Sequence, residues 1–275
     1  MDVFAAFIAP ALAGVFVGVM SGLLGVGGGT IMVPIFRLAF GMSPLASTAT
    51  SLFAIIPTSI SGVVAHTRAK TCVPKLGLAL GVGGAVMSPV GVWLASVSPG
   101  WLVICVAAVV IGFSAFKMFK KAVKCAPAPR AGASFAHSAT PKPVPDQPVL
   151  SRKQYLQGAC IGLVAGLASG YVGVGGGFIM VPLMLAILDI PMSLASGTSL
   201  IAIMILAIPG VIEQGLLGNI DYLAGIAIVV GSIPGTLVGA RLVRVVPERQ
   251  LRFIFGGFLL VAAVMLMLNE FGILG

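Results

Sequence analysis

The amino-acid sequence predicts an all-α membrane protein that crosses the bilayer several times and is built from two related halves. Hydrophobic residues make up 59% of the 275-residue chain and charged residues only 8%, whereas soluble domains are about a quarter charged. No long apolar run alternates with period two, so helices rather than barrel strands must satisfy the backbone in lipid. A glycine-rich motif occurs twice, which indicates an internal duplication.

The duplicated motif reads SGLLGVGGGTIMVP at residues 21–34 and SGYVGVGGGFIMVP at residues 169–182. The two copies lie 148 residues apart and share 11 of 14 residues. The preceding segment repeats as well and lacks a basic start, so we keep it as structure rather than as a signal peptide. Its repeated glycines are Gly14, Gly18 and Gly22, which recur as Gly162, Gly166 and Gly170. The sequence thus predicts membrane repeat 1 at 1–119, a linker at 120–154 and membrane repeat 2 at 155–275.

Each repeat contains five apolar segments that we expect to form helices. They span 4–24, 28–40, 44–65, 76–97 and 101–119 in repeat 1, and 155–172, 178–188, 193–212, 222–240 and 251–268 in repeat 2. Several reach the ~20 residues that a spanning helix needs. Glycine at every fourth position is typical of close helix packing, and it occurs in the first segment of repeat 1 and, through Gly231, Gly235 and Gly239, in the fourth segment of repeat 2.

The second segment of each repeat is short, with 13 residues in repeat 1 and 11 in repeat 2. At 1.5 Å per residue these helices reach roughly 16–20 Å, less than the ~30 Å hydrocarbon core. We therefore expect each to form a re-entrant hairpin with the helix before it, turning at the glycine-rich motif. The third segments follow start signals: Ser43-Pro44 is typical of an N-cap and first helical residue, and Asp189 or Ser193 flanks Pro191.

The charges predict how the chain sits in the membrane. Of 16 basic residues, 15 fall in the stretches 66–75, 117–153 and 241–252. The positive-inside rule places these stretches in the cytoplasm, where contact with acidic lipids is a secondary role for them. The loop 213–221, the repeat equivalent of the first stretch, is acidic instead. We therefore expect two inverted repeats, a cytoplasmic, flexible linker with six prolines and both termini outside; inverted repeats are typical of secondary transporters.

The glycine-rich turns are the main candidate site. Backbone amides in such turns are not shielded by side chains, and the helix that follows each turn presents its positive dipole end to it. This combination favours a bound anion, while close helix packing is the alternative interpretation. The candidate glycines are Gly25, Gly27, Gly28 and Gly29 in repeat 1, and Gly173, Gly175, Gly176 and Gly177 in repeat 2.

Other polar residues are candidates for binding or gating. The repeated hydroxyl pairs Thr50-Ser51 and Thr198-Ser199 could donate to an oxyanion or bond the preceding helical turn. His66, its repeat equivalent Gln214 and the neighbouring Glu213 are candidates for gating or proton coupling, or are simply helix ends at the interface. Arg37, inside a short segment, either snorkels or neutralises a substrate.

Several classes of function are disfavoured. The four cysteines show neither a CxxC pair nor a histidine at metal spacing. GVGGG is not in register with a dinucleotide-binding motif, and there is no GKS or GKT for a P-loop. We therefore expect no metal, no cofactor and no enzymatic activity. The distribution of the net charge of +9 points to a lipid bilayer and not to nucleic acid; a homo-oligomer stays open.

The motifs GLLGVGGGTIMVP, GYVGVGGGFIMVP, ASTATSL and ASGTSL, together with His66 and GNID at 218–221, resemble the TauE/SafE family of sulfite and organosulfur-anion exporters. The resemblance covers nearly the whole chain except the linker, whose length and basic, proline-rich composition depart from the family. It implies an exporter of a small sulfur-containing anion, such as sulfite or a sulfonate. The mechanism implied is alternating access around a site at the membrane midplane.

Two further interpretations stay open at this point. An anion channel of the same fold would share the site but not the transport cycle. A membrane-embedded thiol enzyme or scaffold would need a cysteine in the central cavity, for which only Cys105 and Cys160 are candidates.

Overall fold

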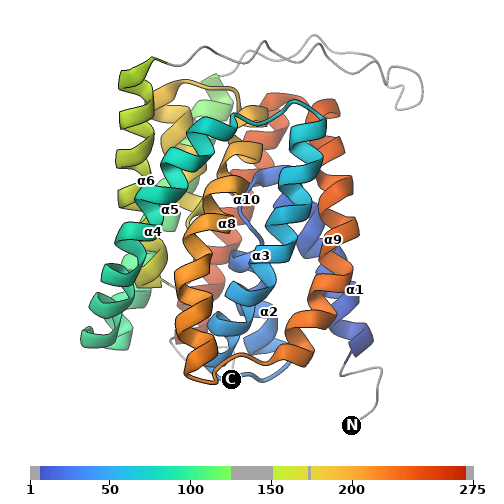
Figure 1. Cartoon of the computed structure of the whole chain (residues 1–275), viewed down its shortest axis with the longest axis vertical. Coiled ribbons are helices and arrows are strands. Elements are labelled where there is room, and N and C mark those ends of the chain that lie inside the picture. Colours follow the sequence, from blue (N-terminus) through green and yellow to red (C-terminus); the bar gives the residue numbers. More distant parts are fainter. Residues whose placement is uncertain (1–6, 125–150, 173–174, 271–275) are drawn as a thin grey trace.

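The computed structural model describes residues 7–124, 151–172 and 175–270, and these form a bundle of helices with no strand among them (Figure 1). Repeat 1 contributes α1 (Ala9–Leu24), α2 (Gly29–Leu38), α3 (Pro44–Arg68), α4 (Pro74–Val97) and α5 (Gly100–Lys124). Repeat 2 contributes α6 (Arg152–Val172), α7 (Gly177–Leu183), the π-helix η2 (Met184–Leu188), α8 (Met192–Leu216), α9 (Tyr222–Val245) and α10 (Glu248–Glu270). All ten predicted segments are therefore helical.

The helices recur at the spacing of the sequence motif. The helices α3 and α8 begin 148 residues apart, and so do α4 and α9 and α5 and α10. Two differences stand out. The second segment is one regular helix in repeat 1, whereas α7 of repeat 2 continues as the π-helix η2. The helix α5 also extends to Lys124 and α6 begins at Arg152, so both reach into the predicted linker.

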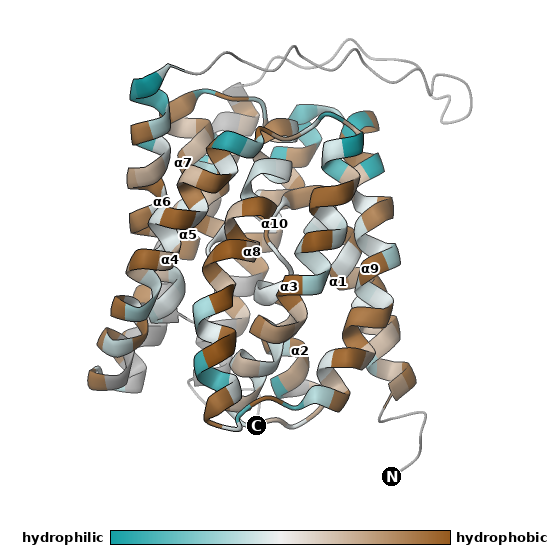
Figure 2. Ribbon diagram, viewed as in Figure 1, coloured by the Kyte–Doolittle hydropathy of each residue, from teal (hydrophilic) through white to brown (hydrophobic). Residues whose placement is uncertain are grey.

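Four helices are long and apolar enough to cross a membrane: Leu45–Arg68, Pro74–Leu94, Met192–Leu216 and Tyr222–Val245. Apolar residues cover the middle of the bundle (Figure 2). Hydrophilic residues gather at the end where α3 and α9 finish and α6 begins, which we call the basic end because Arg68, Arg244 and Arg152 lie there. This distribution fits a multi-pass membrane protein.

The two repeats pack closely against each other at glycine residues of their helices. The helix α1 packs along α9 of the other repeat, and α6 packs in the equivalent way along α4. A side chain on the α1 glycines would overlap the backbone of α9, and one on the α6 glycines that of α4. The contacts are Gly14 with Ile228, Gly18 with Ser232 and Gly22 with Thr236, and in repeat 2 Gly162 with Leu80, Gly166 with Gly84 and Gly170 with Ser88. The predicted close packing is confirmed for these positions.

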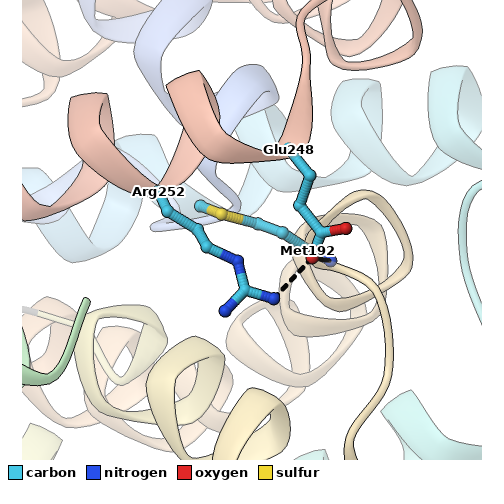
Figure 3. Close-up of polar contacts among 3 residues, drawn as sticks. All are labelled: Met192, Glu248 and Arg252. Atoms are coloured by element: carbon cyan, nitrogen blue, oxygen red, sulfur yellow. Dashed lines mark hydrogen bonds and ion pairs between the residues drawn. The ribbon is translucent and has the colours of Figure 1, made fainter. Parts of the chain in front are cut away.

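The start signals of the third segments differ in outcome. Ser43 caps α3 as predicted, since its hydroxyl accepts a hydrogen bond from the Ala46 amide at 3.2 Å. Neither Asp189 nor Ser193 caps α8. The Met192 amide instead donates to the Glu248 carboxylate of α10 at 3.3 Å, and Arg252 holds that carboxylate at 2.6 Å (Figure 3). A distant carboxylate therefore replaces the expected local cap.

Candidate functional site

The two glycine-rich turns lie against each other in the centre of the bundle. We call residues 25–29 turn 1 and residues 173–177 turn 2; Gly173 lies outside the described residues. A Cβ atom on Gly177 would lie 2.7 Å from both the Gly25 carbonyl oxygen and the Val26 Cα atom. Gly175 faces the Val26 carbonyl and Ile55. Residues far apart in the sequence are thus brought to one place, as the repeat symmetry predicts.

The backbone of both turns requires glycine. Gly25 ends α1 with φ of 70°, Gly27 and Gly28 follow with φ of 79° and 83°, and Gly175 has φ of 79°. Residues with a Cβ atom rarely adopt this left-handed region. A side chain at Gly25 would also overlap Ser196 and the Ser199 hydroxyl. Substitution is therefore opposed by conformation at both turns, and by space at Gly25 of turn 1 and Gly177 of turn 2.

The turn amides are buried and lack acceptors. Among the described residues, no acceptor is found for the amides of residues 26–30 or of residues 175–178, although all of these residues are buried. More than nine in ten buried backbone N–H groups in proteins have a partner. Unpaired amide donors from the two turns therefore lie close together, and those of turn 1 lie at the start of α2. Such a group of donors suits a bound anion.

Thr30, in the first turn of α2, adds a free hydroxyl to this region and was not predicted. Its side chain is 2% exposed, and its Oγ1 atom has no hydrogen-bond partner. It lines an apolar cavity of about 560 Å³ between α1, α2 and α10. The repeat equivalent is Phe178, which is fully buried in the core. The signal in the sequence was this Thr/Phe difference, one of three between the two motifs and the one that directly follows GVGGG.

The predicted threonines connect the two repeats. The Thr50 hydroxyl accepts a hydrogen bond from the Asp221 amide at 3.0 Å, just before α9. The Thr198 hydroxyl accepts one from the Val73 amide at 3.0 Å, just before α4, and donates to the Leu194 carbonyl at 2.6 Å. Both threonines therefore hold the start of the fourth helix of the opposite repeat, and Thr198 has no hydrogen left for an anion.

The predicted serines bond to backbone carbonyls. Ser199 lies directly at turn 1, where its Oγ atom is 2.6 Å from the Gly25 carbonyl oxygen and 2.8 Å from that of Ser196. Ser51 donates to the Thr48 carbonyl at 2.9 Å, within its own helix. A hydroxyl has one hydrogen, so the Ser199 hydrogen is directed at a carbonyl and the residue positions turn 1 in this conformation.

The four gating candidates lie in different places. His66 is fully buried and joins α3 to α1: its Nε2 atom is 2.9 Å from the Gly22 carbonyl and its Nδ1 atom 2.8 Å from the Thr71 hydroxyl. Its equivalent Gln214 is half-buried and accepts from Asn219 at 2.8 Å, beside the exposed Glu213. Arg37 lies in the last turn of α2, about 12 Å along the axis from Gly29. Only His66 therefore lies next to a turn.

The cysteines and acids form no second site. Among the described residues, no group of three His, Cys, Asp or Glu side chains could hold a metal ion. Cys72 is buried and Cys160 is exposed on α6. Burial raises the pKa of the Cys72 thiol, and the hydrogen bond with Thr67 only partly offsets this. A thiol in that setting is less nucleophilic than a free one.

The chain resembles membrane transporters over most of its length. It is 26% identical to the "Probable membrane transporter protein YunE" of Bacillus subtilis over 248 residues, which cover 86% of this chain and 89% of that protein. It is 28% identical to YdhB, described in the same words, over 236 residues, with the same coverage. For YjnA the identity is 25% over 271 residues, which cover 93% of this chain and 97% of that protein.

No solved structure matches the chain. A family profile described as "Sulfite exporter TauE/SafE" matches residues 10–266, which include both turns, His66 and the hydroxyl pairs. The resemblance seen in the motifs therefore extends over nearly the whole chain. The protein belongs to the sulfite exporter TauE/SafE family of membrane transporters.

Proposed function

We propose that the protein is a secondary transporter that exports a small sulfur-containing anion, such as sulfite or a sulfonate, and binds it between turn 1 and turn 2. The observation that carries this proposal is the set of buried turn amides without acceptors. An oxyanion would accept several of these hydrogen bonds at once. The start of α2 adds about half a positive charge to the same place.

The electrostatics of the site suit release as well as binding. No basic side chain reaches the turns, since Arg37 lies at the far end of α2. Neutral amides bind an oxyanion through hydrogen bonds and do not hold it by a fixed opposite charge. The membrane potential, negative inside, favours outward movement of an anion by about 2.3 kcal/mol per charge per 100 mV.

Many transporters that work by alternating access contain two repeats that lie in the membrane with opposite orientation. Two features support this arrangement. The connection from α3 to α4 lies at the basic end, and the equivalent connection from α8 to α9 lies at the opposite end (Figure 1). The packing of α1 on α9 is mirrored by that of α6 on α4. The short α2 and α7–η2 segments then form hairpins that turn inside the membrane.

The orientation can be tested independently of transport. With the basic end in the cytoplasm, a reporter fused after the last residue is expected outside the cell, and one inserted in the 125–150 segment is expected inside. A C-terminal reporter in the cytoplasm would contradict the opposite orientation.

The transport activity itself is tested with purified protein in liposomes. Saturable flux of sulfite or a sulfonate, stimulated by anion on the opposite side, supports the transporter. Flux far above transporter turnover without such counter-flow would favour the channel. A protein that moves none of sulfite, thiosulfate, sulfonates and carboxylates would overturn the proposal.

The thiol enzyme is a weaker alternative. Of its two candidates, Cys160 is exposed on α6, and the side chain of Cys105 lies outside the described part of the structure. Burial raises the pKa of a third cysteine, Cys72, which lowers its thiolate fraction. Replacement of all four cysteines by serine is expected to leave flux intact. Loss of flux in that variant would instead favour a function that depends on a cysteine thiol.

A further inference from the structure

A second cavity, separate from the turns, lies between α3 and α9 at the basic end. It has a volume of about 300 Å³ and is lined by Arg68, Arg241 and Arg244. No carboxylate lines it. In the described part of the chain, none of these three guanidinium groups donates a hydrogen bond or forms an ion pair, and the Nε atom of Arg244 is buried. Three arginines, with up to five donors each, thus line one cavity, and none of them pairs with a protein acceptor among the described residues.

The internal duplication does not explain why three arginines line this cavity. The repeat equivalents of the three arginines are Leu216, Trp93 and Ser96, none of which is basic. The positive-inside bias places basic residues at this end of the molecule but does not require them to face one cavity. Two other arginines at the same end have partners: Arg252 pairs with Glu248 at 2.6 Å, and Arg249 lies 5.7 Å from the centre of the Phe253 ring.

The walls of the cavity indicate what enters it. Val64, Leu237 and Val245 line it and are 42%, 38% and 61% exposed. Exposed apolar side chains on long apolar helices face lipid. The cavity therefore combines a cationic rim at the end of the bundle with an apolar wall that faces the bilayer. A phosphodiester headgroup with attached acyl chains has the matching distribution of charge and apolar surface.

We propose that this cavity binds the phosphate headgroup of an anionic phospholipid, with its acyl chains along the exposed surface of α3 and α9. The phosphate oxygens accept from Arg241 and Arg244 on α9 and from Arg68 on α3. The bound lipid would therefore clamp the end of α3, which carries His66, to α9. This site is independent of the anion that the turns transport.

The test compares Arg241→Gln/Arg244→Gln with Arg152→Gln/Arg249→Gln, which removes two charges at the same end outside the cavity. The purified variants are titrated with phosphatidylglycerol or phosphatidylcholine, and bound lipid is counted by native mass spectrometry. Wild type and the control pair are expected to retain phosphatidylglycerol in preference to phosphatidylcholine. The cavity pair is expected to bind phosphatidylglycerol about 25-fold more weakly, about fivefold for each guanidinium. Equal retention by both pairs would overturn the proposal.

Two further arms separate the lipid from other anions and from misfolding. If inorganic phosphate protects wild type from thermal unfolding as well as phosphatidylglycerol does, and the cavity pair loses that protection, the cavity takes free anions and the lipid proposal is wrong. The same holds if the cavity pair changes the KM of flux but not lipid retention. Arg241→Lys/Arg244→Lys keeps the charge and the membrane orientation. It is expected to retain part of the lipid preference, because lysine cannot form the bidentate contact; unchanged retention would contradict the arginine geometry.

Discussion

The helix after turn 1 begins beside a cavity, whereas the helix after turn 2 begins inside the packed core. The first residues after the two GVGGG sequences are Thr30 and Phe178, which are repeat equivalents. Thr30 lines a cavity of about 560 Å³ and has an unpaired hydroxyl, while Phe178 is fully buried in the main hydrophobic core. The two similar turns are therefore followed by residues in different surroundings.

The polar contacts of the helices around the two turns also differ between the repeats. The helix that leads into turn 1 is held by the buried His66, through the Gly22 carbonyl. The equivalent Gln214 bonds to Asn219 of its own loop and lies near the surface. The interface of α3 with α9 contains the Thr58–Ser232 hydrogen bond of 2.5 Å, where the equivalent positions of repeat 2 are Leu206 and Gly84. The contacts of His66 and of Thr58 with Ser232 are thus buried polar contacts of the α3 side that have no counterpart on the α8 side.

The largest effect is expected at the turns themselves. Gly27→Val and Gly175→Val should abolish anion flux while the protein still inserts, because both glycines have φ of 79°, a conformation that valine does not adopt without strain. Flux per inserted protein in liposomes is the measurement. Gly112→Ala is the control, since a Cβ atom there meets no atom within 4 Å. Normal flux in both valine variants would mean that the glycines serve packing alone.

The next effect separates His66 from its repeat equivalent. His66→Ala removes two buried hydrogen bonds and should lower the free energy of unfolding by about 1–3 kcal/mol. Gln214→Ala should change it by less than about 0.5 kcal/mol, because its contacts lie near the surface. Thermal unfolding in detergent measures both. Equal losses in the two variants would show that the difference between the repeats does not extend to their stability.

Substitution of Thr30 is expected to have a smaller effect, which is measured on both stability and the KM of flux. Thr30→Val keeps the shape and removes a hydroxyl that has no partner, so stability should stay the same or rise slightly. If the hydroxyl binds the transported anion, KM should rise about tenfold, as expected for a lost hydrogen bond to a charged group. An unchanged KM would remove Thr30 from the site and leave the amides as the donors.

The smallest effect concerns the threonines, where the two repeats are alike. Thr50→Val and Thr198→Val should each cost about 1 kcal/mol of stability, because each removes an acceptor 3.0 Å from an amide that precedes a helix. The two losses should agree within about 0.5 kcal/mol. Chemical or thermal unfolding measures them. A variant that unfolds like wild type but has lost flux would show that the hydroxyl contacts the substrate directly.

Much of the fold could be predicted because it depends on local properties. Apolar length predicted the ten helical segments, and glycine spacing predicted that α1 and α9 pack closely against other helices. That they pack on each other came only from the structure. The Ser43 cap was predictable because its bond spans three residues. The start of α8 was not, since its amide bonds to Glu248, 56 residues away. The burial of His66 was also missed, because a position near a helix end does not reveal which helix will cover it.

The sequence by itself determined the membrane class, the duplication, the two turns and the family, because composition, length and spacing are properties of the chain alone. Only the tertiary structure decided which polar groups are free. Ser199, Thr50 and Thr198 bond to residues of the opposite repeat, up to 174 positions away, while Thr30 and the turn amides meet no acceptor. Whether a donor is available depends on the carbonyls that packing brings within hydrogen-bond distance, and that distance exists only in the folded molecule.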